Sequence, residues 1–190
     1  IKKKIIMKKI NEFIKLYENS FFESAKISDE MLKKFNLLYK LILKIKKNKK
    51  KILIFGNGGS AAISSHFSVD MTKIGQVRTV NFNESDLLTC FSNDYGYENW
   101  MKKCIEFYSD YGDMIILVSS SGESKNVIRA AKTSKNKKLK VVTFTGFKHS
   151  NKLKKLGDLN FWVNSSTYNH IENIHQYWLL LMTDLVNEQR

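Results

Sequence analysis

The spacing of hydrophobic residues changes near residue 50 of this chain of 190 residues. Before that point, apolar residues recur three and four positions apart from about residue 5 to 23, and again from residue 29 to the lysine-rich run that ends at residue 51. This spacing predicts two amphipathic helices. Their apolar stripes are long for surface helices, which leaves open whether part of each stripe is a subunit interface. Neither stretch carries an evident catalytic group.

After residue 50, short apolar runs alternate with helical patterns. The runs lie at 52–55, 79–82, 114–118, 141–145 and 159–163. Helices are expected between most of them, at about 61–73, 85–93, 98–108, 124–134 and 151–156, and a long last helix at 168–187. Strands that alternate with helices predict an α/β fold with a doubly wound, five-stranded parallel sheet flanked by helices. Ligands in such sheets bind at the carboxyl ends of the strands, where the strand order switches.

The first apolar run leads into a glycine-rich turn, residues 56–60, with the sequence Gly-Asn-Gly-Gly-Ser. Glycines allow a tight turn with positive φ, and they let backbone N–H groups approach a ligand closely. Ser60 is expected to be the N-cap of the helix that follows. Because free N–H groups and the helix dipole then point at one place, the sequence predicts an anion site, with phosphate as the expected ligand.

A second turn of this kind follows the run 114–118. Residues 119–124 have the sequence Ser-Ser-Ser-Gly-Glu-Ser and precede another expected helix. Hydroxyl groups in this position donate hydrogen bonds to a phosphate without adding charge. Taken alone, the turn is equally well explained as an ordinary loop with Ser124 as the helix cap. Together with the glycine turn at the equivalent end of another strand, it favours a phosphate ligand. Neither the nucleotide P-loop nor the dinucleotide fingerprint is present.

The net charge, the cysteines and the lengths of the apolar runs bear on the partners and the location of the protein. The formal net charge of +14 invites a nucleic-acid interpretation. The lysines gather at expected helix ends and turns, so we interpret them as solvated surface that can steer an anionic substrate, and we expect no nucleic-acid partner. Cys90 and Cys104 lack metal-type spacing and are expected to be reduced thiols in the cytoplasm. No apolar run has transmembrane length, so no membrane partner is expected.

Four motifs in this order carry a family resemblance: the glycine turn 56–60, His66-Phe67, residues 93–97 (Asn-Asp-Tyr-Gly-Tyr), and the serine turn 119–124. Together they resemble the sugar isomerase (SIS) superfamily and, within it, the sedoheptulose 7-phosphate isomerases, also called phosphoheptose isomerases. The resemblance covers about residue 51 to the end. It implies that residues 51–190 form a SIS domain and that residues 1–50 are a helical lead-in used for oligomerisation, within a single compact domain overall.

The resemblance implies an aldose–ketose isomerase. Its reaction would convert sedoheptulose 7-phosphate to D-glycero-D-manno-heptose 7-phosphate, an early step of heptose biosynthesis for surface polysaccharide. The family usually works as a homotetramer with active sites between subunits. Matching motifs imply that the phosphate is held by Ser60, Ser119, Ser121 and Ser124. They imply further substrate contacts by Asn57, Gly58, Gly59, Asn93, Asp94 and Ser120.

Such an isomerisation moves a proton between adjacent carbons through an ene-diol, so it needs a base and a group or metal that stabilises the oxyanion. The family commonly holds zinc between a His and a Glu after the glycine turn and a Gln and a His on the last helix. The first pair is here His66 and Asp70, four residues apart and therefore on one helix face. On the last helix, Glu172 replaces the Gln, and Leu180 falls at the position of the His.

Glu172 and His175 lie three residues apart, so they are expected to project together from the last helix. We interpret Glu172 as the general base, with His175 or His66 as its acid partner beside Asp70. A metal held by His66, Asp70 and Glu172 is expected to be weak or absent. The alternative is that His175 is a hydrogen-bonded core histidine and Glu172 a solvated residue. His149 and His170 are expected in loops.

Two other functions remain open at this stage. A non-catalytic SIS protein would bind a sugar phosphate, or a regulatory partner such as a replication initiator, and Leu180 favours it. An isomerase for another sugar phosphate, such as a ketohexose phosphate, would use the same chemistry.

Overall fold

Five parallel strands form the centre of the computed structural model, which describes residues 2–188. The strands are β1 (Ile52–Phe55), β2 (Thr79–Val80), β3 (Met114–Ser119), β4 (Lys140–Thr145) and β5 (Leu159–Trp162). Their order in the sheet is β2-β1-β3-β4-β5. The chain therefore moves outward from β1 in one direction to β2 and in the other to β3, so the switch in strand order lies at β1 and β3. The α/β fold with a doubly wound, five-stranded parallel sheet is confirmed.

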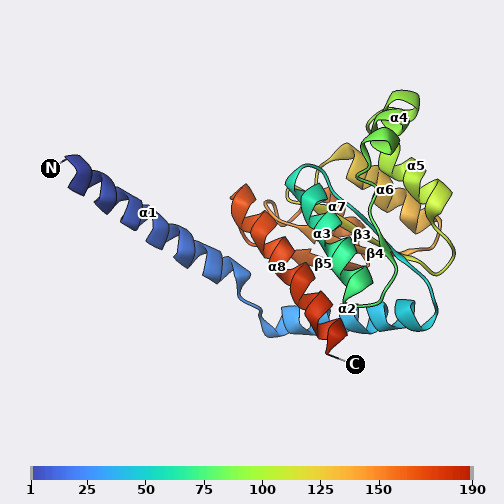
Figure 1. The fold of residues 1–190 in the computed structure, drawn as a ribbon, viewed down its shortest axis with the longest axis horizontal. Coiled ribbons are helices and arrows are strands. Elements are labelled where there is room, and N and C mark those ends of the chain that lie inside the picture. The colour runs from blue at the N-terminus through green and yellow to red at the C-terminus, as the bar shows by residue number, and fades with distance from the viewer. Residues whose placement is uncertain (1, 189–190) are drawn as a thin grey trace.

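Eight helices surround this sheet within the described residues. They are α1 (Lys2–Ala25), α2 (Asp29–Lys47), α3 (Gly59–Lys73), α4 (Ser85–Tyr95), α5 (Trp100–Tyr108), α6 (Lys125–Asn136), α7 (Lys152–Leu156) and α8 (Tyr168–Asn187). Helices α2, α3 and α8 cover one face of the sheet, and α5, α6 and α7 cover the other (Figure 1). None of the described helices combines the length and the apolar character that crossing a membrane requires.

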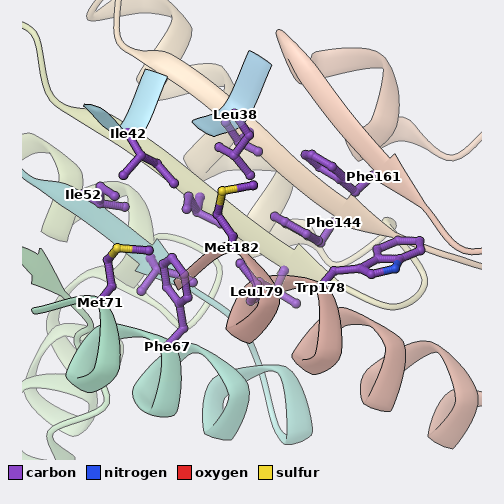
Figure 2. Close-up of a cluster of buried hydrophobic side chains, with 14 of the residues drawn as sticks. Leu38, Ile42, Ile52, Phe67, Met71, Phe144, Phe161, Trp178, Leu179 and Met182 are labelled. Carbon is purple, nitrogen blue, oxygen red and sulfur yellow. The ribbon is translucent and has the colours of Figure 1, made fainter. Parts of the chain in front are cut away.

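Side chains that alternate between the two faces of the strands form two hydrophobic cores, one on each side of the sheet. Successive strand residues point to opposite faces, so Ile52 and Ile54 pack under α2, α3 and α8, while Leu53 and Phe55 pack under α5 and α6. Figure 2 shows the first of these cores, in which Trp178 of α8 lies beside the aromatic rings of Phe144 and Phe161. Both faces of each central strand are buried, which explains why these strands appear in the sequence as continuous apolar runs.

The two N-terminal helices differ in their packing. Helix α2 begins at the N-cap Ser28, whose hydroxyl accepts a hydrogen bond from the backbone N–H of Met31, and it buries four apolar side chains against the sheet. Helix α1 projects away from the rest of the chain (Figure 1). Only its last turns pack, through Tyr17 and Phe21, against α8. Along the rest of α1, Ile6, Ile10 and Phe13 stay exposed.

Three local expectations are wrong. The second apolar run forms a strand of only two residues, β2, rather than the whole of 79–82. The N-cap of α3 is Gly58, so Ser60 lies inside the first turn of that helix. His170 is not in a loop but in the first turn of α8, where it is buried and packs edge-on against Tyr17, with ring centroids 4.2 Å apart. This last contact is formed with α1, more than 150 positions away in the sequence, and local pattern carries no sign of it.

Candidate active site

A small cavity lies at the carboxyl ends of β1 and β3, at the switch in strand order. Its volume is about 130 Å³. Seven of the residues predicted for substrate binding or catalysis line it: Asn57, Ser60, Ser119, Ser120, Ser121, Ser124 and Glu172. Val118 and Tyr168 complete the lining. The glycine turn, the serine turn and the start of α8 therefore meet at one place, which we call the cradle.

Two glycines explain the shape of the first wall. Gly56 lies so close to the backbone of Ser60 that a Cβ there would collide with it, and Gly58 has a φ of 54°, which favours glycine. Because Gly58 caps α3 without a side-chain hydrogen bond, the first N–H groups of that helix have no capping side chain. Ser60 is buried beside them, and its hydroxyl makes no hydrogen bond with any described residue.

Glu172 enters the cradle from α8. A Cβ on Gly59 would collide with the carboxyl group of Glu172, so this carboxylate lies directly against the first residue of α3. Only a glycine leaves room for it there. Two segments that are far apart in the sequence thus place a carboxylate, a free hydroxyl and a helix N-terminus around one cavity.

The serine turn forms the opposite wall. The Ser119 hydroxyl accepts a hydrogen bond from the N–H of Gly122, at 3.2 Å, and Gly122 has a φ of 64°. The buried hydroxyl of Ser120 has no partner among the described residues, and Ser124 caps α6 without a side-chain hydrogen bond. Hydroxyls that only accept from the backbone, or that have no partner, suit an anionic oxygen, since each retains an O–H that can donate.

A pair of amides fixes Asn57 beside the cradle. The Asn57 side chain donates to Oδ1 of Asn126 at 3.0 Å, and the Asn126 side chain donates back to Oδ1 of Asn57 at 2.9 Å. The hydroxyl of Tyr97 donates to the same Asn57 oxygen at 3.1 Å. Asn126 is buried, so it holds Asn57 in one orientation.

His66 and Asp70 pair with one another on α3. Nε2 of His66 lies 3.1 Å from Oδ2 of Asp70, and Nδ1 of His66 lies 3.3 Å from the side-chain nitrogen of Gln176 on α8. Gln176 lies four residues after Glu172, so both face α3 from the same side of α8. The pair does not line the cradle, but it lies farther along the seam between α3 and α8 that begins at Glu172.

The expectation that His175 projects together with Glu172 is wrong for this chain. His175 is fully buried, and its Nε2 donates to the backbone oxygen of Thr145 at 3.1 Å. Burial lowers the pKa of His175 to about 4, against the opposing effect of that hydrogen bond. The side chain is therefore a neutral core histidine. Three residues along a helix correspond to a rotation of about 300°, so His175 points about 60° away from Glu172 and into the core. Gln176, four residues after Glu172, lies on the same side of α8 as Glu172 instead.

Asn93 and Asp94 do not reach the cradle within this chain. Both lie on α4, which buries none of its residues, and both are exposed. The Asn93 amide donates to the Asp94 carboxylate at 3.0 Å. Among the described residues, Tyr97, just beyond α4, connects this segment to the glycine turn by a hydrogen bond.

Comparison with known proteins agrees with this geometry. The profile of the SIS domain family matches residues 20–146. The phosphoheptose isomerase of Aliarcobacter butzleri is 33% identical over 159 residues, which cover 80% of this chain and 82% of that relative. The phosphoheptose isomerase of Fusobacterium nucleatum is 35% identical over 142 residues, which cover 71% of this chain and 72% of that relative. The chain belongs to the SIS family of phosphoheptose isomerases. The solved phosphoheptose isomerase of Neisseria gonorrhoeae superposes with a TM-score of 0.85 at 27% identity, covering 93% of this chain and 99% of the other.

The zinc that the family resemblance implies does not fit the residues of a single chain. His66 and Asp70 are paired, but Glu172 lies at Gly59 in the cradle, and no three His, Cys, Asp or Glu side chains among the described residues gather into a metal-binding group. Leu180 offers no ligand atom. We therefore assign no step of the reaction to a metal.

Sequence reasoning assigned no role to four residues of this neighbourhood. Tyr168 lines the cradle, Asn126 and Tyr97 orient Asn57, and Gln176 contacts His66. Tyr168 and Gln176 each lie four residues from Glu172, so helical spacing alone pointed to both. Asn126 gave no such signal, and Tyr97 appeared only as the last residue of the motif 93–97, because the contact of both with Asn57 arises only in the folded chain.

Proposed function

We propose that this chain is an aldose–ketose isomerase that converts sedoheptulose 7-phosphate to D-glycero-D-manno-heptose 7-phosphate, for heptose biosynthesis toward surface polysaccharide. The observation that carries the proposal is the cradle, which gathers the glycine turn, the serine turn and Glu172 around one cavity. The names of the relatives from A. butzleri, F. nucleatum and N. gonorrhoeae support the same activity.

The phosphate binds among the serine hydroxyls. Ser60, Ser119, Ser121 and Ser124 surround the cavity, and the N-termini of α3 and α6 direct their positive dipole ends toward it. No lysine or arginine lines the cradle among the described residues, so hydroxyl and backbone donors supply the binding. Asn57, Gly58, Gly59 and Ser120 then line the path of the sugar chain, and Asn93 and Asp94 remain proposed contacts.

Glu172 is the general base. Its carboxylate takes a proton from C1 of the ketose, which gives an ene-diol, and the proton is returned at C2 while the hydroxyl proton moves from one oxygen to the other. The position of Glu172 against Gly59 holds its carboxylate at the edge of the phosphate site, facing a sugar that extends from it.

His66 is the proposed acid partner, with Asp70 orienting its ring. Asp70 accepts from Nε2 and orients the ring. Nδ1, which Gln176 contacts in this structure, is the nitrogen that gives its proton to the sugar oxygen when the sugar takes the place of the Gln176 amide. A substrate that extends from the cradle along the seam between α3 and α8 passes Glu172 first and His66 next. His175 has no direct part in this scheme, because it is enclosed in the core.

The test is incubation of the purified protein with sedoheptulose 7-phosphate, with the aldose product followed by chromatography. Parallel reactions contain a chelator or added zinc. The proposal expects a heptose 7-phosphate in the chelated reaction, and zinc content measured on the same sample shows whether metal is present. Turnover that appears only with zinc would overturn the assignment of catalysis to Glu172 and His66 without a metal. If fructose 6-phosphate reacted faster than sedoheptulose 7-phosphate, the proposed substrate would be wrong and a ketohexose phosphate would replace it.

One alternative function has specific support. Leu180 and the enclosed His175 leave α8 with fewer polar groups at the site than the family pattern has, which favours a protein that binds sugar phosphate without converting it. The same incubation distinguishes the two functions. Binding of the sugar phosphate without any product, in both metal conditions, would favour the non-catalytic protein.

We propose further that α1 mediates assembly into a homotetramer and that residues 1–50 act as the oligomerisation segment of the SIS domain. Ile6, Ile10 and Phe13 expose 57%, 44% and 67% of their surface on a helix that projects from the chain. Exposed apolar stripes of this kind are typical of helix–helix interfaces. Light scattering should give the mass of a tetramer for the full chain and a smaller mass for Phe13→Asp. The free thiols of Cys90 and Cys104 support a location in the cytoplasm.

A further inference from the structure

A second and larger cavity lies beside β5, outside the cradle. It has a volume of about 650 Å³ and lies between the end of α1, the start of α2, α7 and the loop that follows β5. We call it the β5 cleft. It shares helix α8 with the cradle but none of the cradle's lining residues: Tyr168 and Glu172 face the cradle, whereas His170 and Trp178 face the β5 cleft. Its size is in the range of small-molecule sites.

Three residues that line this cleft carry buried nitrogen atoms without partners. His170 is 5% exposed and its Nε2 makes no hydrogen bond with any described residue, and the same holds for Nε1 of Trp178, which is 1% exposed. Nε1 of Trp162 is a third such group on the same wall. A buried indole N–H without an acceptor is costly and rare in folded proteins, and two of them belong to residues that line this cavity.

The mouth of the cleft carries positive charge. Lys34 and Lys154 both line it, and the Lys154 ammonium lies 4.9 Å from the centre of the Trp162 ring. Lys34 is paired with Glu30 at 2.7 Å, whereas Lys154 has no salt bridge within the described part of the chain. Partial burial lowers the pKa of Lys154, and the charge of Lys34 adds to this effect. An anion bound between these two ammonium groups would offset their mutual repulsion.

The remaining wall supplies both kinds of hydrogen-bonding group. The hydroxyls of Ser28 and Ser165 accept from backbone N–H groups at 3.3 Å and 3.1 Å, so each retains an O–H that is free to donate. Glu23 and Glu30 provide carboxylates that accept. Donors and acceptors side by side are suited to the hydroxyl groups of a sugar, which donate and accept in turn.

We propose that the β5 cleft is a second binding site, separate from the cradle, for a small phosphorylated sugar. Its phosphate lies between Lys34 and Lys154. Its hydroxyl groups meet the serine hydroxyls and the carboxylates that line the same cleft. The proposal does not depend on the catalytic activity, because no residue of the cradle takes part in it.

Tryptophan fluorescence of the full-length protein tests this site. Trp162 and Trp178 line the cleft, whereas Trp100 lies in the core on the other face of the sheet, so the emission reports on the cleft. Glucose 6-phosphate should change the emission in a saturable way. Lys154→Gln should weaken this binding about tenfold, because it removes one charge-assisted contact. Lys155→Gln, which alters an exposed neighbour on α7, is the matched control and should bind within about twofold of the unmodified protein. Equal melting temperatures of the two variants exclude misfolding as the cause.

Three comparisons can overturn the proposal. Glucose without phosphate should give no response, and inorganic phosphate should bind more weakly than the sugar phosphate; equal binding of inorganic phosphate would mean that the site takes a free anion. Ser121→Ala, which alters the cradle, should leave the response unchanged. A response lost in Ser121→Ala but kept in Lys154→Gln would place the ligand in the cradle and contradict a second site, as would the absence of any response at millimolar ligand.

Discussion

The cradle and the seam between α3 and α8 are two halves of one site, but the chain builds them in different ways. The loops that directly follow β1 and β3 form most of the cradle, so its serines and glycines are fixed by neighbours in the sequence, and Glu172 of α8 closes it where the seam begins. The seam depends on how α3 and α8 pack together, through residues such as His66 and Gln176 that lie 110 positions apart. The first half has unengaged hydroxyls that suit a phosphate. The second half has a carboxylate and an imidazole that are suited to moving a proton.

This difference predicts that the two halves can be impaired separately. Changes in the cradle should affect how tightly the phosphate is held, whereas changes along the seam should affect the rate of the chemical step. The following variants test that separation, from the largest expected effect to the smallest.

Removal of the carboxylate should have the largest effect. Glu172→Gln keeps the size of the side chain but removes the base, so kcat for sedoheptulose 7-phosphate should fall about a thousandfold. Asp184→Asn, which neutralises an exposed carboxylate on the same helix, should leave kcat unchanged. Steady-state kinetics of both variants give the comparison. If Glu172→Gln retained its turnover, the base would have to be sought at Asp70.

His175 should make stability depend on pH. Its folded pKa of about 4 lies below the ordinary value of 6.5, so between these values the unfolded chain binds a proton that the folded chain does not. The free energy of unfolding should therefore decrease by about 3 kcal/mol as the pH falls from 6.5 to 4. Denaturant unfolding at several pH values measures this change.

A matched pair of variants isolates this contribution. His175→Gln should remove that part of the pH dependence, whereas His149→Gln, at an exposed histidine, should retain it. An unchanged slope in His175→Gln would mean that another group titrates in this range.

Gly59→Ala should disturb the contact between the two halves. Gly59 lies in the first turn of α3 without a positive φ, so alanine suits its backbone, but the new Cβ would collide with the Glu172 carboxyl group. That carboxylate is the end of a flexible side chain and can turn away. Stability should change by less than about 1 kcal/mol, whereas kcat should fall about a hundredfold because the base is misplaced. In a Glu172→Gln background the same substitution should have no further effect on kcat.

Ser121→Ala should have the smallest effect and act on binding. It removes one hydroxyl from the cradle, so KM should rise about tenfold with kcat little changed. Ser166→Ala, an exposed serine outside the cradle, is the control. A fall in kcat without a rise in KM would indicate that the cradle serves the chemical step as well.

The same contrast between the two halves explains what the sequence could predict. The strands and the two turns were predictable, because an apolar run that ends in glycines or serines is local information. Glu172 was placed at the site through its motif, and the structure brings it into the cradle. The burial of His175 was one of two alternatives that the sequence left open, because the choice depends on the Thr145 carbonyl at the end of β4. The burial of His170 depends likewise on Tyr17 of α1.

The most direct test of the separation is the binding of sedoheptulose 7-phosphate to the Glu172→Gln protein, measured by titration calorimetry beside Ser121→Ala. If the cradle binds and Glu172 catalyses, the Glu172→Gln protein should bind the sugar phosphate with an affinity within about threefold of KM for the unmodified protein and form no product, since the lost carboxylate acts mainly in the transition state. Ser121→Ala should bind it about tenfold more weakly. Loss of binding in Glu172→Gln together with full binding in Ser121→Ala would contradict the account.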